Sequence, residues 1–289
     1  MKISFVIPAH NEENYIGRCL DSVFREIGGR KDCEVIVVDN NSADRTAETA
    51  ARYPGARVIR ETRRGANRAR ETGFEASSGE FVAFIDADTD MPRGWLATAE
   101  GAFARDPKLA CISGPFLYYD LPRPVLALVR LFYYIAYGIY WANKVFFRRS
   151  NVVQGGNYML RRAALEKIGG QNVNISFYGD DTDLAIRLSK VGNVIFTFKL
   201  PIRASGRRLA KEGAFTMGAR YGINNFWIVL FGRPFTKTAR VIRLESSGEP
   251  VYEPENKFRE AALIALASAI FIGIPLALAY LAYWLAVTH

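Results

Sequence analysis

Two aspartates one residue apart, Asp86 and Asp88, follow directly after an apolar run at residues 81–85. The run has the length and composition of a buried β-strand. Paired carboxylates suit a hard divalent cation, and such a cation often binds a phosphate group as well. Because ligands of open α/β sheets bind beyond the carboxyl ends of the strands, the pair predicts a metal and phosphate site.

The elements that would position this pair are predicted by the first 115 residues. Short apolar runs indicate strands, and amphipathic stretches between them indicate helices. The predicted strands are 3–8, 34–39, 57–60, 81–86 and 110–113, and the predicted helices are 12–27, 43–52, 66–77 and 94–105. This alternation is typical of an α/β fold with a mostly parallel sheet flanked by helices.

Polar residues follow three of the predicted strands. They occupy residues 8–12 after the first strand, 39–42 after the second and 86–88 after the fourth. Three polar strand ends on one edge favour a ligand site. Taken singly, each has a simpler interpretation, because Asn41 or Ser42 could cap a helix and Glu12 could lie in a first helical turn.

Composition limits the classes of function. A chain of 289 residues with 49% hydrophobic content has room for one large α/β domain and an appendage. The net charge of +9 could serve nucleic acid, anionic lipid or a phosphorylated substrate. The three cysteines are widely spaced and there are two histidines, which indicates reduced thiols and argues against a zinc site.

Two common nucleotide motifs are missing. The first strand is not followed by a G-x-G-x-x-G sequence, which argues against a dinucleotide-dependent dehydrogenase. A G-x-x-x-x-G-K-[ST] sequence is absent from the whole chain, which excludes a P-loop NTPase. A nucleotide would therefore be held by side chains and a metal.

Five blocks of the sequence resemble, in order, the motifs of family 2 glycosyltransferases, which have the GT-A fold. The blocks are residues 6–12, 37–46, 65–73, 84–88 and, together, 155–157 with 179–184. The resemblance covers roughly residues 3–198, and its specificity comes from the order of the blocks.

For the donor, the resemblance implies binding roles in the first three blocks. Asp39 matches the acidic residue that reads the nucleotide base, while Pro8, Ala9 and Glu12 match the loop that lines the base and ribose. Arg70 matches a basic residue near the nucleotide and its diphosphate. The implied donor is a nucleotide-diphosphate sugar. Uridine is favoured over guanosine only by its frequency in the family.

For the reaction, the resemblance implies a metal site and a base. Asp86 and Asp88 match the aspartate pair that binds Mg²⁺ or Mn²⁺; Asp88 is the stronger metal candidate and Asp90 a further one. Asp181 matches the catalytic base. The residues alone leave another interpretation open, because acids at the start of a predicted helix at 180–190 also gain from the helix dipole.

The chemistry of glycosyl transfer explains why an enzyme of this kind needs a metal-binding carboxylate pair and a carboxylate base. Negative charge grows on the departing diphosphate, and a divalent cation held by carboxylates stabilises that charge. The acceptor hydroxyl attacks from the opposite face and must lose a proton, which a carboxylate can take. One base without a second nucleophile predicts direct displacement with inversion at the anomeric carbon.

An uncharged apolar stretch at residues 261–287 predicts a transmembrane helix, with a buried core helix as the alternative. Before it, residues 199–259 carry twelve Lys or Arg and five Glu. The positive-inside rule therefore predicts a single-pass protein of the plasma (cell inner) membrane, with the catalytic part in the cytoplasm and the C-terminus outside. Residues 1–2 lead straight into the predicted first strand at 3–8, so we expect no secretory signal peptide.

A second apolar stretch, rich in aromatic residues, occupies residues 125–142. If it crossed the bilayer once, Asp88 and Asp181 would lie on opposite sides and could not share a site. Insertion at the membrane interface fits better, although a buried helix of an acceptor domain remains an alternative.

These features divide the chain into four predicted parts. Residues 1–115 form a nucleotide-sugar-binding half, and 116–232 form an acceptor-binding half that contains the interfacial segment. Residues 233–260 form a basic juxtamembrane segment, followed by the span at 261–287.

The predicted partners are a nucleotide-sugar donor, the membrane and a lipid or lipid-linked acceptor. Polyprenyl phosphate is one open acceptor, used with a GDP- or UDP-sugar. A processive synthase is disfavoured because the Q-x-x-R-W motif is absent. A nucleotidyltransferase would carry a glycine-rich basic loop after the first strand. This class is disfavoured because residues 8–12 stand at that place in this chain. A non-catalytic membrane adaptor would leave the ordered acids unexplained, and we find no nucleic-acid-binding motif.

Overall fold

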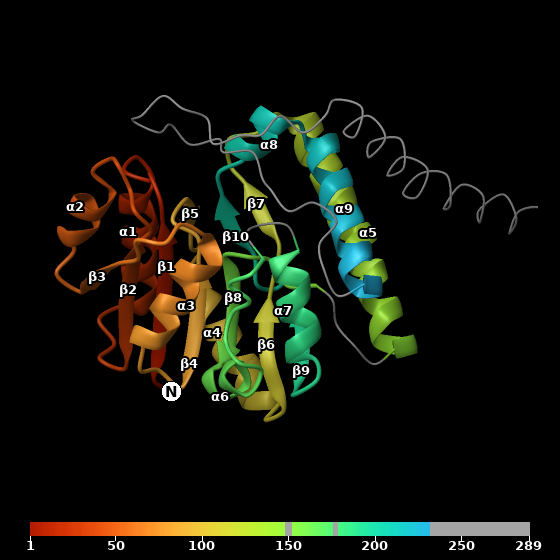
Figure 1. The fold of residues 1–289 in the computed structure, drawn as a ribbon, viewed down its shortest axis with the longest axis horizontal. Coiled ribbons are helices and arrows are strands. Elements are labelled where there is room, and N and C mark those ends of the chain that lie inside the picture. The colour runs from red at the N-terminus through yellow and green to blue at the C-terminus, as the bar shows by residue number, and fades with distance from the viewer. Residues whose placement is uncertain (148–151, 176–178, 232–289) are drawn as a thin grey trace, which may run out of the picture.

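The computed structural model describes residues 1–147, 152–175 and 179–231 (Figure 1). The predicted juxtamembrane segment at 233–260 and the predicted span at 261–287 lie outside the described residues. Within the described ranges, none of the helices combines the length and the hydropathy that a bilayer span requires.

A seven-stranded sheet forms the centre of the molecule, with the strand order β3-β2-β1-β4-β8-β6-β9. Its strands are β1 (Ile3–Ala9), β2 (Cys33–Asp39), β3 (Ala56–Arg60), β4 (Phe81–Ile85), β6 (Leu109–Ser113), β8 (Asn157–Arg161) and β9 (Asn193–Phe196). β1 is parallel to β2 and β4, and β6 is parallel to β9, whereas β8 is antiparallel to both of its neighbours. The predicted mostly parallel sheet is confirmed.

Helices cover both faces of this sheet, so the central strands are apolar on both sides. The helices are α1 (Ile16–Ile27), α2 (Thr46–Ala51), α3 (Ala66–Ala76), α4 (Trp95–Arg105), α6 (Arg162–Lys167) and α7 (Asp180–Leu188). α1, α2 and α4 pack on the face that carries Phe5 and Ile7, and α3, α6 and α7 pack on the face that carries Val6 and Phe84. Burying a side chain such as Phe84 contributes roughly 1.5–3 kcal/mol.

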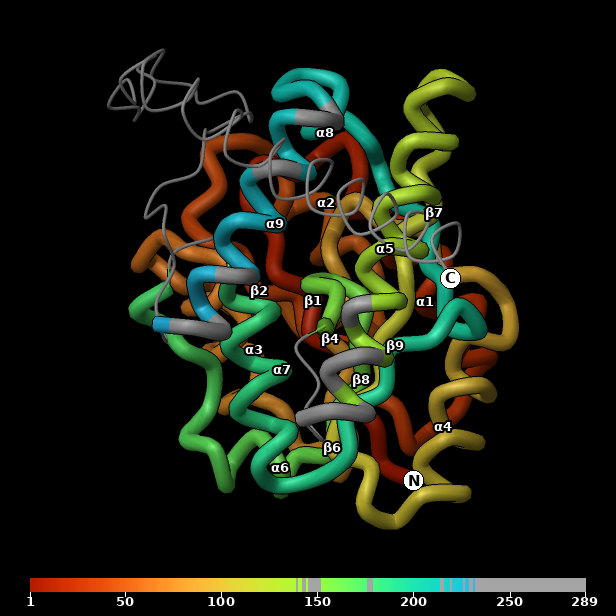
Figure 2. Tube along the Cα trace, turned by 90° about the vertical axis from the view of Figure 1, so that its right-hand side faces the viewer, coloured from red at the N-terminus to blue at the C-terminus, as the bar shows by residue number. Residues whose placement is uncertain are grey.

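A smaller sheet and three helices complete the described fold. The sheet has the order β5-β10-β7, formed by β5 (Thr89–Asp90), β10 (Ile202–Ala204) and β7 (Phe116–Tyr118). The helices are α5 (Arg123–Phe147), α8 (Arg207–Glu212) and α9 (Ala214–Phe231). α5 and α9 are in contact (Figures 1 and 2). Their approach requires Gly218, where a Cβ atom would lie 2.6 Å from the Phe132 ring.

The predicted boundaries differ from the observed ones mainly at α1. The helix begins at Ile16 rather than at residue 12. The backbone N–H of Glu12 donates to Thr46 Oγ1 at 2.7 Å, so Glu12 belongs to a loop that is tied to the loop after β2. The predicted interfacial segment 125–142 lies within α5, which is longer at both ends.

Candidate active site

Two adjoining glycines bring Asp86 and Asp181 to the same place. A Cβ atom on Gly156 would lie 2.0 Å from the carboxyl carbon of Asp86, and one on Gly155 would lie 2.5 Å from Asp181 Oδ1. The Gly155 N–H donates to Asp181 Oδ2 at 2.9 Å, and the Asp86 N–H donates to the Gly156 carbonyl at 3.1 Å. Two aspartates almost a hundred residues apart therefore flank one dipeptide.

Arg70, on α3, joins the aspartate pair to the start of α7. Its guanidinium contacts Asp86 Oδ1 at 3.2 Å and Asp180 Oδ2 at 3.0 Å, and it also donates to Asn67 Oδ1. Burial opposes its charge, but the Asp86 carboxylate raises the pKa of Arg70, so the guanidinium stays protonated. Arg70 thus lies beside Asp86, and its predicted role near the nucleotide and its diphosphate stays a prediction.

Asp88 contacts a second arginine, Arg207, at the start of α8. Arg207 Nη2 lies 3.1 Å from Asp88 Oδ2 and 2.5 Å from Glu12 Oε1. Glu12 is therefore connected to the metal candidate Asp88 through one guanidinium.

The loops after β1 and β2 form the predicted donor side. Ala9 is paired with Asp39, and Pro8 with Val38, in the parallel register of the two strands. Beyond the strands, Asn11 N–H donates to Ser42 Oγ at 3.0 Å. Side-chain hydrogen bonds thus fix the two loops against each other.

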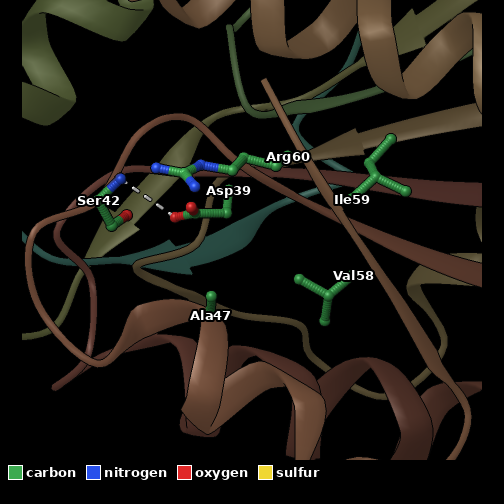
Figure 3. A pocket seen from close by; sticks show the side chains of 6 residues that line it. All are labelled: Asp39, Ser42, Ala47, Val58, Ile59 and Arg60. Carbon is green, nitrogen blue, oxygen red and sulfur yellow. Dashed lines mark hydrogen bonds between the residues drawn. The ribbon is translucent and has the colours of Figure 1, made fainter. Parts of the chain in front are cut away.

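Asp39 opens into a surface hollow of about 310 Å³. Figure 3 shows Asp39, Ser42 and Arg60 close together, with Ser42 N–H donating to Asp39 Oδ1 at 3.3 Å. Ala47, Val58 and Ile59 also line the hollow; the apolar side chain of Val58 lies on the same side as Ala47, whereas that of Ile59 turns to the opposite face of β3. A polar end beside apolar walls suits a flat heteroaromatic ring, and the volume lies at the lower end of the range for ligand pockets.

Asp90 has different surroundings from Asp86 and Asp88. Its carboxylate contacts Arg18 and Arg25 of α1, each at 3.1 Å, and Arg203 of β10 at 3.6 Å. These ion pairs join α1 to the smaller sheet. As a metal ligand, Asp90 would have to exchange these guanidinium partners for the cation, and this assignment stays a prediction.

The charge of Asp181 is set by its surroundings. Burial, and then the neighbouring Asp180 carboxylate, raise the pKa of Asp181 well above its usual value; Arg70 and the Gly155 N–H act in the opposite direction. A raised pKa makes a carboxylate a stronger proton acceptor once it is ionised.

Sequence reasoning did not assign a role to Asn157, which begins β8. Its Oδ1 accepts from Trp95 Nε1 at 2.9 Å, and its Nδ2 donates to the carbonyls of Gly114 and Leu200, also at 2.9 Å. These bonds fix the strand that follows the glycine pair. The only signal in the sequence was the position of Asn157 directly after Gly155 and Gly156.

A tyrosine on α5 reaches the same loop. The Tyr133 hydroxyl donates to Gln154 Oε1 at 2.8 Å and accepts from the Phe116 N–H at 3.0 Å. Gln154 directly precedes Gly155. The segment that the sequence predicts to lie at the membrane is therefore in contact with the loop that holds Asp181.

The fold and site define a class of protein: a GT-A-like α/β domain with an aspartate pair after the fourth strand of its mostly parallel sheet. The model of the family described as "Glycosyl transferase family 2" matches residues 4–169, more than half of the chain. The chain belongs to this family.

Known relatives and solved structures agree with this assignment. The chain is 28% identical over 214 residues to the probable glycosyltransferase YdaM of Bacillus subtilis, covering 70% of this chain and 50% of the relative. It is 37% identical over 99 residues to the glycosyltransferase AglE of Haloferax volcanii, covering 32% of this chain and 33% of the relative. The matched segments thus span at most half the length of these two relatives.

Two solved structures share the fold. The mannosyltransferase PcManGT from Pyrobaculum calidifontis, in complex with GDP-Man and Mn²⁺, has a TM-score of 0.63 at 21% identity, over 99% of this chain and 80% of that one. The glucosyl-3-phosphoglycerate synthase from Mycobacterium tuberculosis, in complex with Mn²⁺ and UDP-Glc, has a TM-score of 0.54 at 24% identity, over 81% and 80%.

Proposed function

We propose that the protein transfers a sugar from a nucleotide-diphosphate sugar to a membrane lipid or lipid-linked acceptor, with inversion at the anomeric carbon. The observation that carries the proposal is the contact of Asp86 and Asp181 with the adjoining glycines Gly156 and Gly155. This contact supports a shared site, because the carboxylate proposed to bind the metal and the carboxylate proposed to act as the base lie against adjoining residues. A UDP-sugar is favoured by family frequency, and the two solved neighbours hold GDP-Man and UDP-Glc.

The donor atoms at the aspartate pair fit Mg²⁺ or Mn²⁺. Among the described residues, His, Cys, Asp and Glu form no group of three or more that could hold a metal ion. Asp86 and Asp88 therefore supply carboxylate oxygens for only part of a coordination sphere. This suits a cation that is held by one or two carboxylates and by the phosphates of its substrate. When bound, the cation would neutralise charge on the departing diphosphate.

The chain's own residues divide the remaining work. Asp181 accepts the proton of the attacking hydroxyl, and its raised pKa supports this role. Arg70 holds Asp86 and Asp180 in place through its buried guanidinium. Asp39 and the loop with Pro8, Ala9 and Glu12 bind the base and ribose.

The outer face of α5 supports a lipid acceptor. Leu131, Tyr134 and Trp141 are exposed by 55%, 65% and 48%, on a stripe that repeats at helical spacing. A surface helix of a globular protein normally turns polar residues outward. The only charged residues of α5 are Arg123, Arg130 and Lys144.

We propose that this stripe rests on an anionic bilayer surface. Aromatic and apolar side chains insert between headgroups, and cations beside them attract anionic lipids. The predicted span at 261–287 would hold the catalytic domain at the cytoplasmic face. A lipid acceptor would then approach the site from the side of α5, whose Tyr133 contacts Gln154.

The test is transfer of labelled sugar by the purified full-length chain. UDP-, GDP- and TDP-sugars are incubated with the protein, Mn²⁺ and a membrane lipid extract, and label is measured in the organic phase. We expect label in lipid with one donor, its loss in Asp88→Ala, and its retention in Asp21→Ala, a matched change on the exposed surface of α1.

The outcomes separate the alternatives. Release of the label by mild acid as a free monosaccharide would indicate that the transferred sugar is itself bonded to phosphate, and hence a polyprenyl-phosphate acceptor. Transfer only to soluble acceptors would reject the lipid part of the proposal. Full activity of both Asp88→Ala and Asp181→Asn would reject the proposed catalytic site, and absence of any transfer would favour the adaptor.

A further inference from the structure

The first residue of α8, Arg207, bridges two acidic residues of the donor site. Its Nη2 contacts both Glu12 Oε1 and Asp88 Oδ2, and its Cζ lies 4.3 Å from the centre of the Tyr15 ring. Glu12 and Tyr15 belong to the loop between β1 and α1, whereas Asp88 follows β4. One guanidinium thus joins the base-binding loop to the metal candidate.

We propose that Arg207 is a built-in counter-ion: it neutralises Asp88 before the donor binds, and it turns to the donor diphosphate when a metal takes its place. The inference rests on the proposed function, because it requires a metal at Asp88 and a diphosphate beside it. It goes beyond that function by making the two binding events interdependent.

The exchange follows from the charges around Asp88. The Asp88 side chain is 19% exposed, so its negative charge is partly removed from water and is stabilised by the nearby guanidinium. A divalent cation on the same carboxylate would repel Arg207. Metal binding at Asp88 and the Asp88–Arg207 ion pair therefore compete.

Glu12 explains why Arg207 would stay in the site. The Glu12 side chain is fully buried, and removing the guanidinium partner of a buried carboxylate is strongly destabilising. The ring of Tyr15 also supports the guanidinium from one side. Arg207 can therefore keep Glu12 as a pivot and exchange only Asp88.

The hydrogen-bond donors of the guanidinium indicate which partner Arg207 would take in place of Asp88. A guanidinium presents five N–H donors in a planar fork that matches phosphate oxygens. A nucleoside diphosphate that enters beside Asp88 offers such oxygens. Metal and nucleotide should consequently bind with positive cooperativity, because each favours the arrangement of Arg207 that the other requires.

The experiment measures Mn²⁺ and nucleoside diphosphate binding to the full-length chain, without any acceptor. Free Mn²⁺ is followed by electron paramagnetic resonance, and UDP and GDP by calorimetry at saturating Mn²⁺. In Arg207→Gln, we expect Mn²⁺ alone to bind roughly tenfold more tightly and the nucleotide roughly tenfold more weakly. Lys211→Gln removes an exposed charge one turn along α8 and should change neither affinity by more than about twofold.

Opposite changes of the two affinities in Arg207→Gln, tighter for Mn²⁺ and weaker for the nucleotide, identify the proposed exchange of partners by Arg207. Weakening of both ligands, or no change in either, would overturn the inference, since an arginine with a purely structural role predicts one of these results. If Arg207→Gln does not fold, Arg207→Lys keeps the charge without the fork, and it should weaken the nucleotide alone. A wild-type chain that binds no nucleoside diphosphate with Mn²⁺ would reject the proposed function as well.

Discussion

The loops after β1 and β2 are joined by hydrogen bonds between polar residues, whereas α5 turns a row of apolar side chains outward. Asn11, Glu12 and Glu13 each donate a backbone N–H to a side chain in the loop after β2 or at the start of α2. On α5, Tyr134 contacts Phe198 at a centroid distance of 5.4 Å and is still 65% exposed.

Under the proposed function, this difference would follow from two kinds of ligand. A nucleotide is polar and has a defined shape, so the loops proposed to bind it would be fixed in advance by short hydrogen bonds. A lipid surface has no fixed shape, and a helix can meet it with apolar area alone. Changes on the donor side should therefore affect chemistry and binding, while changes to the outer face of α5 should affect location and leave folding intact.

The largest expected effect is on the base. Asp181→Asn keeps the shape of the side chain and the acceptor for the Gly155 N–H, but it cannot take a proton. We expect kcat to fall by about 10²–10⁴-fold with little change in donor affinity, measured by transfer rate and by calorimetry. Asp183→Asn, which changes the (i, i+4) partner of Arg187, serves as control. Equal losses in both variants would mean that helix α7 needs its acids only for structure.

The next largest effect is expected for a substitution at Gly156, beside Asp86. Gly156 has φ +76°, and a Cβ atom would strike Asp86, so Gly156→Ala should cost about 1–3 kcal/mol of unfolding free energy and weaken Mn²⁺-dependent nucleotide binding. Gly138 on α5 has open space around its Cβ position, and Gly138→Ala should stabilise the chain by roughly 0.5–1 kcal/mol. Denaturant unfolding measures both. If both substitutions changed the free energy of unfolding by similar amounts, the loop beside Asp86 and the helix α5 would not differ in this respect.

The smallest effect on stability is expected on the outer face of α5. A spin label on Tyr134→Cys, in a Cys33→Ser background, should be more accessible to oxygen than to a nickel chelate once the full chain is in anionic vesicles. A label on Lys167→Cys, at an exposed position of α6, should show the opposite preference. Both variants should unfold within about 0.5 kcal/mol of the wild type. Preference for the nickel chelate at both positions would place α5 in water.

The strands of residues 1–115 were predicted well because their signals in the sequence are local. The strands 3–8, 34–39, 57–60, 81–86 and 110–113 are each within one residue of the observed bounds at either end. In a parallel sheet, the ends of such strands meet at one edge, so Asp39 and Asp86 could be placed together from spacing alone.

The contacts that complete the site could not be predicted in this way. Arg207 is 195 residues from Glu12 along the chain, and nothing in the sequence near Arg207 distinguishes it from the adjacent Arg208. Asp90 matched a metal-ligand spacing, yet its three arginine partners come from α1 and β10. For α5, the sequence showed that the segment is apolar but not which side chains remain exposed after packing on α9.

The direction of β8 determines which loop brings Gly155 and Gly156 to the candidate site. β1, β2 and β4 bring their carboxyl ends to the ligand edge, but β8 runs the other way, and the pairing of Asn157 with Ile85 puts its beginning there. The loop that enters β8, rather than one that leaves it, therefore carries Gly155 and Gly156. In the sequence, α5 is the element that precedes this loop, so exchanging α5 together with the loop between relatives would bring the backbone partner of Asp181 with it.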